Sequence, residues 1–183
     1  RSVEKLAVVA EQGAHHVIHS AAAPDDDGQP QVARFRDEVK ALTGGRGVDV
    51  VYDAVGGPIS LETLRCVAFG ARYCIVGWAA TPFVARGKGQ RGAPNANVLP
   101  TNLIMMKGLD VLGCPTVIST HRDPSIRRPR LAAIDAWIEA GKLVPHVGRT
   151  FAWDGSLDSA RAALRAKWRS EAVGTVVLRW TDA

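Results

Sequence analysis

The sequence has few cysteines and no long apolar run, and each absence excludes a class of protein. Cys66, Cys74 and Cys114 form an odd, scattered set without CxxC or zinc-finger spacing, so a disulfide framework is not predicted and the thiols are expected to be buried. No run of apolar residues is long enough for a transmembrane helix. Residues 1–5 lack the apolar stretch of a secretory signal. These absences favour a cytoplasmic protein.

Aromatic residues are also scarce, at 6% of the chain, and charge of one sign is not concentrated. The formal net charge of +5 favours anionic ligands in general. The two densest basic segments, 86–92 and 122–130, lack interleaved aromatic residues and the spacing of a phosphate-binding loop, so nucleic acid is not the favoured partner. His15, His16 and the aspartates at 25–27 do not have the spacing of zinc or calcium ligands, and no metal site is predicted.

One stretch is typical of a buried parallel strand. Residues 47–53 form an almost continuous β-branched run, which indicates a strand covered on both faces. Two glycines at 56 and 57 follow, and Pro58 then begins a helical pattern. Open α/β sheets bind ligands beyond the carboxyl ends of their strands, and glycine lets a ligand approach the backbone closely. Residues 54–57 are therefore the best candidate for a binding edge.

Helical and extended patterns alternate along the rest of the chain. The helix that begins at Pro58 is expected to bury Leu61, Leu64 and Val67 and to end at Gly70. Other helices are predicted near 2–13, 32–43, 131–141 and 157–168, and strands at 14–20, 72–78, 109–114, 143–153 and 174–179. This rhythm predicts an α/β fold with a doubly wound parallel sheet over residues 1–142. The closing strand, helix and strand over 143–183 are expected to belong to a second unit.

Several segments together resemble a known family. They are Leu-Thr-Gly-Gly-Arg-Gly-Val-Asp-Val-Val at 42–51, Asp-Ala-Val-Gly-Gly at 53–57, Ile-Val-Gly-Trp at 75–78, Pro-Thr-Asn-Leu at 100–103, and the ending from 141–146 to 174–178. The chain resembles the C-terminal half of a medium-chain dehydrogenase/reductase, closest to the NADPH:quinone oxidoreductase branch. This resemblance implies a partial Rossmann-like sheet whose glycine-rich turn and catalytic domain lie outside the sequence. Residues 143–183 would return to that catalytic domain.

The resemblance also implies a set of cofactor contacts. Ser2 and Lys5 occupy the segment that holds the adenosine ribose in the family, and a lysine without a neighbouring ribose-binding carboxylate favours NADPH over NAD. Ser20 stands where quinone reductases often have a tyrosine. The nicotinamide end would be lined by residues that follow two strands, namely Ala54, Val55, Val76, Gly77 and Trp78. The resemblance assigns no catalytic residue and no metal ligand to this sequence.

The predicted function is therefore part of an NADPH-dependent oxidoreductase of the quinone or enone reductase type, which transfers hydride to a conjugated carbonyl. The chain alone is expected to be inactive. The segment from Leu109 to Cys114 resembles the edge strand through which family members form homodimers. Two alternatives stay open: a zinc-dependent alcohol dehydrogenase of the same superfamily, and a non-catalytic remnant or binding module that uses the basic segments.

Overall fold

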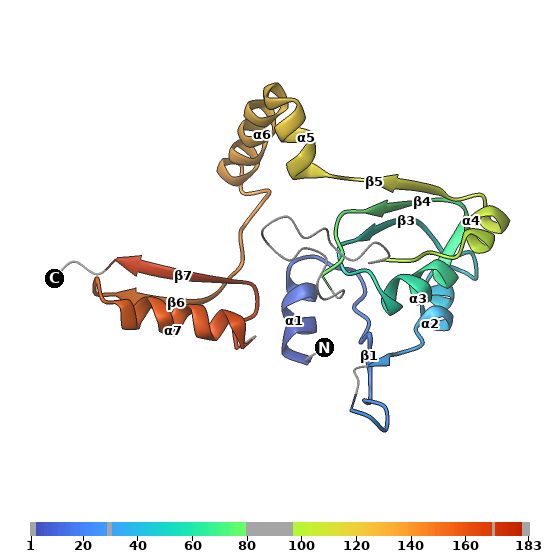
Figure 1. Ribbon diagram of the computed structural model, residues 1–183, viewed down its shortest axis with the longest axis horizontal. Helices are drawn as coiled ribbons and strands as arrows, with labels where there is room; N and C mark the ends of the chain where they lie inside the picture. The colour runs from blue at the N-terminus through green and yellow to red at the C-terminus, as the bar shows by residue number, and fades with distance from the viewer. Residues whose placement is uncertain (1–2, 29–30, 80–96, 170, 181–183) are drawn as a thin grey trace, which may run out of the picture. The chain divides into compact units, whose positions relative to one another are not determined.

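The computed structural model describes residues 3–28, 31–79, 97–169 and 171–180, and Figure 1 shows the elements in chain order. Two compact units are present: residues 18–122 form one, and residues 1–17 with 123–183 form the other. The basic segment 86–92 and Ser2 lie outside the described residues.

A three-stranded parallel sheet forms the centre of the unit that spans 18–122. Its strands are β3 (Val48–Asp53), β4 (Val67–Ile75) and β5 (Asp110–Gly113), in the order β3-β4-β5. The helices α3 (Pro58–Cys66) and α4 (Thr101–Lys107) connect them (Figure 1). The unit also contains β1 (Ala21–Ala22) paired with β2 (Gln31–Val32), α2 (Arg36–Leu42) and α5 (Thr116–Arg122). Parallel strands joined by helices confirm the predicted α/β class.

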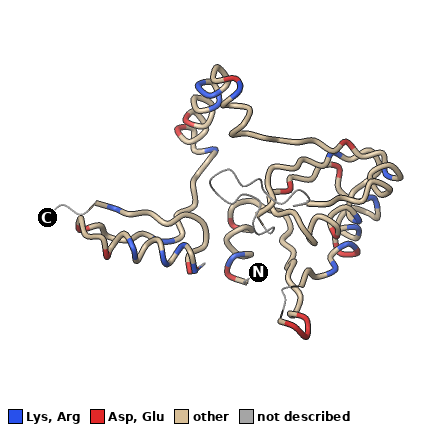
Figure 2. Tube along the Cα trace, viewed as in Figure 1, with Lys and Arg blue, Asp and Glu red and all other residues tan. Residues whose placement is uncertain are grey.

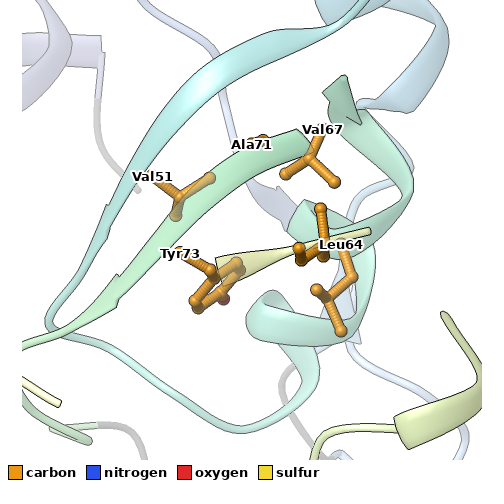
Figure 3. Close-up of a cluster of buried hydrophobic side chains, with 6 residues drawn as sticks. Val51, Leu64, Val67, Ala71 and Tyr73 are labelled. Carbon is orange, nitrogen blue, oxygen red and sulfur yellow. The ribbon is translucent and has the colours of Figure 1, made fainter. Parts of the chain in front are cut away.

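The core of this unit lies between one face of the sheet and the helices α3 and α4. Val51 and Tyr73 project from neighbouring strands towards Leu64 of α3, and Tyr73 and Leu64 are fully buried (Figure 3). Leu103 and Ile104 of α4 pack against the same cluster. Because successive residues of a strand point to opposite faces, Val50 and Tyr52 project the other way. Tyr52 is 78% exposed, so the expectation that β3 is buried on both faces is wrong within this unit.

The other unit contains a parallel strand pair joined by a helix. The strands β6 (Val147–Trp153) and β7 (Thr175–Trp180) flank α7 (Leu157–Trp168), as the C-terminal pattern predicts. Ala163 and Ala166 of α7 are buried, and Ser156 caps the helix by accepting a hydrogen bond from the backbone N–H of Ser159. The unit also includes α1 (Val3–Glu11), the short 3₁₀ helix η1 (Pro124–Ile126) and α6 (Arg127–Glu139).

Two predicted elements differ from the structure. Residues 14–20 are irregular: the carbonyl of Ser20 accepts from the N–H of Ala33 at 3.1 Å, but the segment belongs to none of the strand pairings of the described residues. The helix after Pro58 ends at Cys66, so Val67 begins β4 and is not helical. Lys107 of α4 explains this end: its Nζ donates to the backbone carbonyls of Leu64 at 2.8 Å and Val67 at 3.2 Å, which satisfies carbonyls that another helical turn would use.

Candidate functional site at the carboxyl edge of the sheet

The carboxyl ends of β3 and β4 are held together by backbone hydrogen bonds. The carbonyl of Asp53 accepts from the N–H of Val76 at 2.8 Å and of Gly77 at 3.3 Å, and the carbonyl of Ala54 accepts from Ala79 at 3.1 Å. Gly77 lies so close that a Cβ there would be 3.2 Å from the Ala54 carbonyl oxygen. The two loops therefore form one small-residue edge, as expected for the ligand side of an open parallel sheet.

The buried carboxylate of Asp53 organises this edge. Its Oδ1 accepts from the backbone N–H of Val55 at 2.8 Å and of Gly56 at 3.0 Å. Its Oδ2 accepts from the hydroxyls of Ser60 at 2.5 Å and Tyr73 at 2.7 Å. Burial alone would raise the pKa of Asp53, but these hydrogen bonds stabilise the ionised form and together lower it. The charged carboxylate fixes the turn that leaves β3.

The glycines of that turn are required by packing within the chain. Gly56 and Gly57 have φ angles of +72° and +66°, a region that other residues rarely adopt. A Cβ on Gly56 would lie 3.0 Å from Cβ of Trp78. The N–H of Gly57 donates to Oδ1 of Asn97 at 3.2 Å. The N–H groups of Val55, Gly56 and Gly57, which precede α3, are thus already satisfied by side chains of the chain.

The structure brings together only part of the predicted cofactor set. Ala54, Val55, Val76, Gly77 and Trp78 lie at this edge, and the residue Trp78 is 44% exposed. The structure does not place the other three members at this edge. Ser20 precedes β1, and its carbonyl accepts from the N–H of Ala33 at 3.1 Å. Lys5 lies on α1, which belongs to the other unit, and Ser2 is outside the described residues. Lys and Arg residues are spread over many elements (Figure 2).

Three residues that shape this edge were not found from the sequence. Tyr73 and Ser60 hold Asp53, and Asn97 holds the N–H of Gly57. Tyr73 is an ordinary strand residue by pattern, and Asn97 is distant in sequence from its partner. Of the three, Ser60 alone has a local signal in the sequence. It is a hydrophilic residue on the inner side of an amphipathic helix, one turn after the glycines, which indicates a buried hydrogen bond.

The cysteines differ from their predicted environment. Cys66 is buried as expected, but Cys74 and Cys114 are partly exposed, so the expectation of three buried thiols is wrong for two of them. Burial and the nearby Glu62 carboxylate raise the pKa of the Cys66 thiol to about 11. Among the described residues, no group of three or more His, Cys, Asp or Glu side chains could hold a metal ion. Nor is any helix of the described part long and apolar enough to cross a membrane.

A family model described as zinc-binding dehydrogenase matches residues 12–178. Quinone oxidoreductase-like protein 2 of Mus musculus is 29% identical over 117 residues, which are 64% of this chain and 30% of that protein. The Nematostella vectensis homologue of that protein is 25% identical over 176 residues, 96% of this chain and 41% of the relative.

Solved structures share the fold. A mycobacterial protein complexed with NADPH superimposes with a TM-score of 0.67 at 22% identity, over 97% of this chain and 47% of that one. The chain therefore spans less than half the length of the proteins that it matches.

Proposed function

The chain belongs to the zinc-binding dehydrogenase family, and from that membership we propose that it is the cofactor-domain portion of an NADPH-dependent oxidoreductase of the quinone or enone reductase type. In the whole protein, the reduced nicotinamide supplies the hydride that is transferred to a conjugated carbonyl. The observation that carries this proposal is the carboxyl edge of β3 and β4, where small residues meet beyond two parallel strands. The similarity to quinone oxidoreductase-like proteins of two animals supports the same reaction class.

The residues at this edge would hold and orient the cofactor. Ala54 and Gly77 have little or no side chain: the glycine lets the two loops pack closely, and the small residues would form the surface against which a planar ring lies. Trp78 offers a partly exposed aromatic surface beside them. Asp53 does not contact the ligand in this proposal: its four hydrogen bonds keep the turn at Val55 in one conformation before the cofactor binds. The edge therefore positions the nicotinamide end, and the chemistry belongs to the cofactor.

NADPH is proposed over NADH because of the residues expected at the adenosine end of the cofactor, which carries the 2′-phosphate in NADPH. Lys5, with Ser2, would bind the 2′-phosphate, for which an ammonium group is a suitable point charge. By the same resemblance, Ser20 would make a weaker contact with the cofactor than the tyrosine of related quinone reductases. The fold shared with a mycobacterial protein that was solved with NADPH is compatible with this choice.

We propose a reaction without zinc, as the resemblance to the quinone reductase branch implies. The zinc-dependent alcohol dehydrogenase alternative would need ligands supplied from outside this sequence.

Cofactor titration tests the proposal. Purified chain, shown to be folded by far-ultraviolet circular dichroism, is titrated with NADPH and with NADH while cofactor fluorescence is followed. We expect NADPH to bind more tightly, and Lys5→Ala to weaken NADPH binding by about tenfold with little effect on NADH, since one charge-assisted hydrogen bond contributes about 1.5 kcal/mol. Lys142→Ala, which removes an exposed lysine of the same unit, is the control. Equal affinities for the two cofactors would contradict the NADPH assignment, and failure of a folded chain to bind either would contradict cofactor binding by this portion.

A further inference from the structure

Two of the three cysteines lie near each other on the open face of the central sheet. Cys74 of β4 is the register partner of Leu112 of β5. Cys114 follows the last residue of β5, and its N–H donates to the carbonyl of Ile75 at 2.9 Å, which continues the ladder by one residue. Alternate residues of a strand point to the same face, so Leu112 and Cys114 share the face of Cys74.

This face is accessible within its unit, whereas the third thiol is not. Tyr52 and Leu112, the neighbours of Cys74 in the register, are both exposed. Cys74 and Cys114 are partly exposed, while Cys66 is buried at 2% exposure. Desolvation, with the charge of the Cys74 thiol and a hydrogen bond to it, raises the pKa of Cys114.

We propose that Cys74 and Cys114 form a dithiol site that is converted reversibly into an intramolecular disulfide by exchange with a low-molecular-weight disulfide. Once deprotonated, one thiol attacks a sulfur of the reagent and releases one reagent thiol, which leaves a mixed disulfide. The second thiol, deprotonated in turn, attacks the protein sulfur of that intermediate and releases the second reagent thiol. The protein loses two protons and two electrons, and one reagent disulfide becomes two thiols.

The backbone permits this bond with a small movement. In a parallel sheet, strands about 4.8 Å apart with a rise of about 3.3 Å per residue place diagonal Cα atoms about 8 Å apart, beyond the roughly 7 Å limit for a disulfide. Cys114 lies beyond the end of β5 and follows Gly113, around which a Cβ would meet nothing within 4 Å. Glycine and open space together allow the backbone at this position to shift towards β4.

Thiol exchange with oxidised glutathione tests the proposal on the full 183-residue chain. The chain is incubated near pH 8, the remaining thiols are alkylated, and the products are identified by mass spectrometry. We expect a monomeric product about 2 Da lighter than the reduced chain, with a linked Cys74–Cys114 peptide pair, and full recovery of both thiols on reduction. Cys66 stays unreactive until denaturant is added, which reports in the same sample that the unit is folded.

Conservative variants separate this site from nonspecific oxidation. Cys74→Ser and Cys114→Ser should each lose the product completely, whereas Cys66→Ser should retain it. In samples where Cys66 stays unreactive because the unit is folded, three results would overturn the proposal. They are stable glutathione adducts on Cys74 or Cys114 without a Cys74–Cys114 disulfide, disulfide-linked dimers in place of the intramolecular bond, or no oxidation at all.

Discussion

At the scale of single residues, the carboxylate of Asp53 has the largest structural role at the candidate site. An ionised carboxylate only accepts hydrogen bonds, and Asp53 receives four from groups that converge on it. Two of these donors are backbone N–H groups of the turn after β3, and two are hydroxyls of α3 and β4. A single charge thus links the strand, the turn and the helix that define the edge.

Replacement of Asp53 by Asn should destabilise the unit by about 1–3 kcal/mol, because an amide nitrogen cannot accept and would leave buried donors unpaired. Asp49→Asn is the control: Asp49 lies on the same strand, but it is exposed and paired only with Arg46 at the surface. The comparison is made from the midpoints of urea denaturation followed by circular dichroism. If the two variants lost the same small amount of stability, the Asp53 network would have no special role.

The same carboxylate predicts how stability depends on pH. Because the pKa of Asp53 is lower in the folded chain than its ordinary value, its contribution to stability is present above the ordinary pKa, about 4. That contribution is lost as the pH falls through the lowered pKa of the folded state. Asp154, whose pKa is lowered to about 2 by hydrogen bonds from Ser156, adds a similar trend in the other unit. Stability measured from pH 6 to pH 3 should therefore fall less steeply in Asp53→Asn than in the unchanged chain, and parallel curves would contradict this.

At the scale of elements, the sequence pattern located β3 and its carboxyl edge, but not the contacts that fix them. The β-branched run and Pro58 are local signals, and the strand and helix occur where they predict. The bonds from Tyr73 to Asp53 and from Asn97 to Gly57 join residues 20 and 40 positions apart, and no periodicity encodes such pairs. The end of α3 was misplaced for the same reason, since its cap comes from Lys107.

Amphipathic patterns also do not reveal what covers a helix face. Leu131, Ile134 and Ile138 recur at helical spacing and α6 forms over them, but all three are exposed. Periodicity shows that a face is apolar, whereas burial requires an element packed against it. The irregular segment 14–20 reflects the same limit, because strand propensity cannot provide a neighbouring strand.

Gly56 provides a test of the turn between β3 and α3. Gly56→Ala should destabilise the chain by about 1–3 kcal/mol, because alanine is strained at a φ of +72° and its Cβ would lie 3.0 Å from Cβ of Trp78. Gly44→Ala is the control for backbone strain alone: Gly44 has a φ of +60°, but a Cβ there would meet nothing within 4 Å. The additional loss in Gly56→Ala therefore measures the contact with Trp78. Thermal unfolding of both variants gives the difference, and equal losses would show that the contact with Trp78 is not restrictive.

At the scale of the whole molecule, apolar surface is exposed in both units. The outer face of β3 exposes Val50 and Tyr52, and α7 exposes Leu164 and Trp168, the latter at 90%. Surfaces of this kind mark places where other protein is packed in an assembly, or where a chain associates with itself. The proteins that this chain matches are more than twice its length, which is consistent with cover supplied in a longer protein.

We therefore expect the purified chain to be marginally stable, with a broad melting transition and self-association at high concentration. Leu164 and Trp168 are one helical turn apart on the same side of α7, so replacing both with Gln should reduce light scattering without loss of helical signal. Gln replacement of the buried Ala163 should instead unfold α7 together with β6 and β7. A sharp cooperative melt from a monodisperse sample of the unchanged chain would refute the expectation.

The edge of β5 predicts how the whole protein assembles. All four residues of β5 are exposed, and β5 is the last strand of the described sheet, so we propose that a homodimer forms by pairing at this edge. The N–H of Cys114 points towards β4, and because donors alternate along a strand, that of Val111 points outwards. Val111→Pro removes this outward donor and should convert a full-length dimer to monomer in sedimentation, since proline cannot donate to a neighbouring strand. Val111→Thr keeps the N–H and should remain dimeric, whereas an unchanged full-length protein that sediments as a monomer at high concentration would exclude assembly through β5.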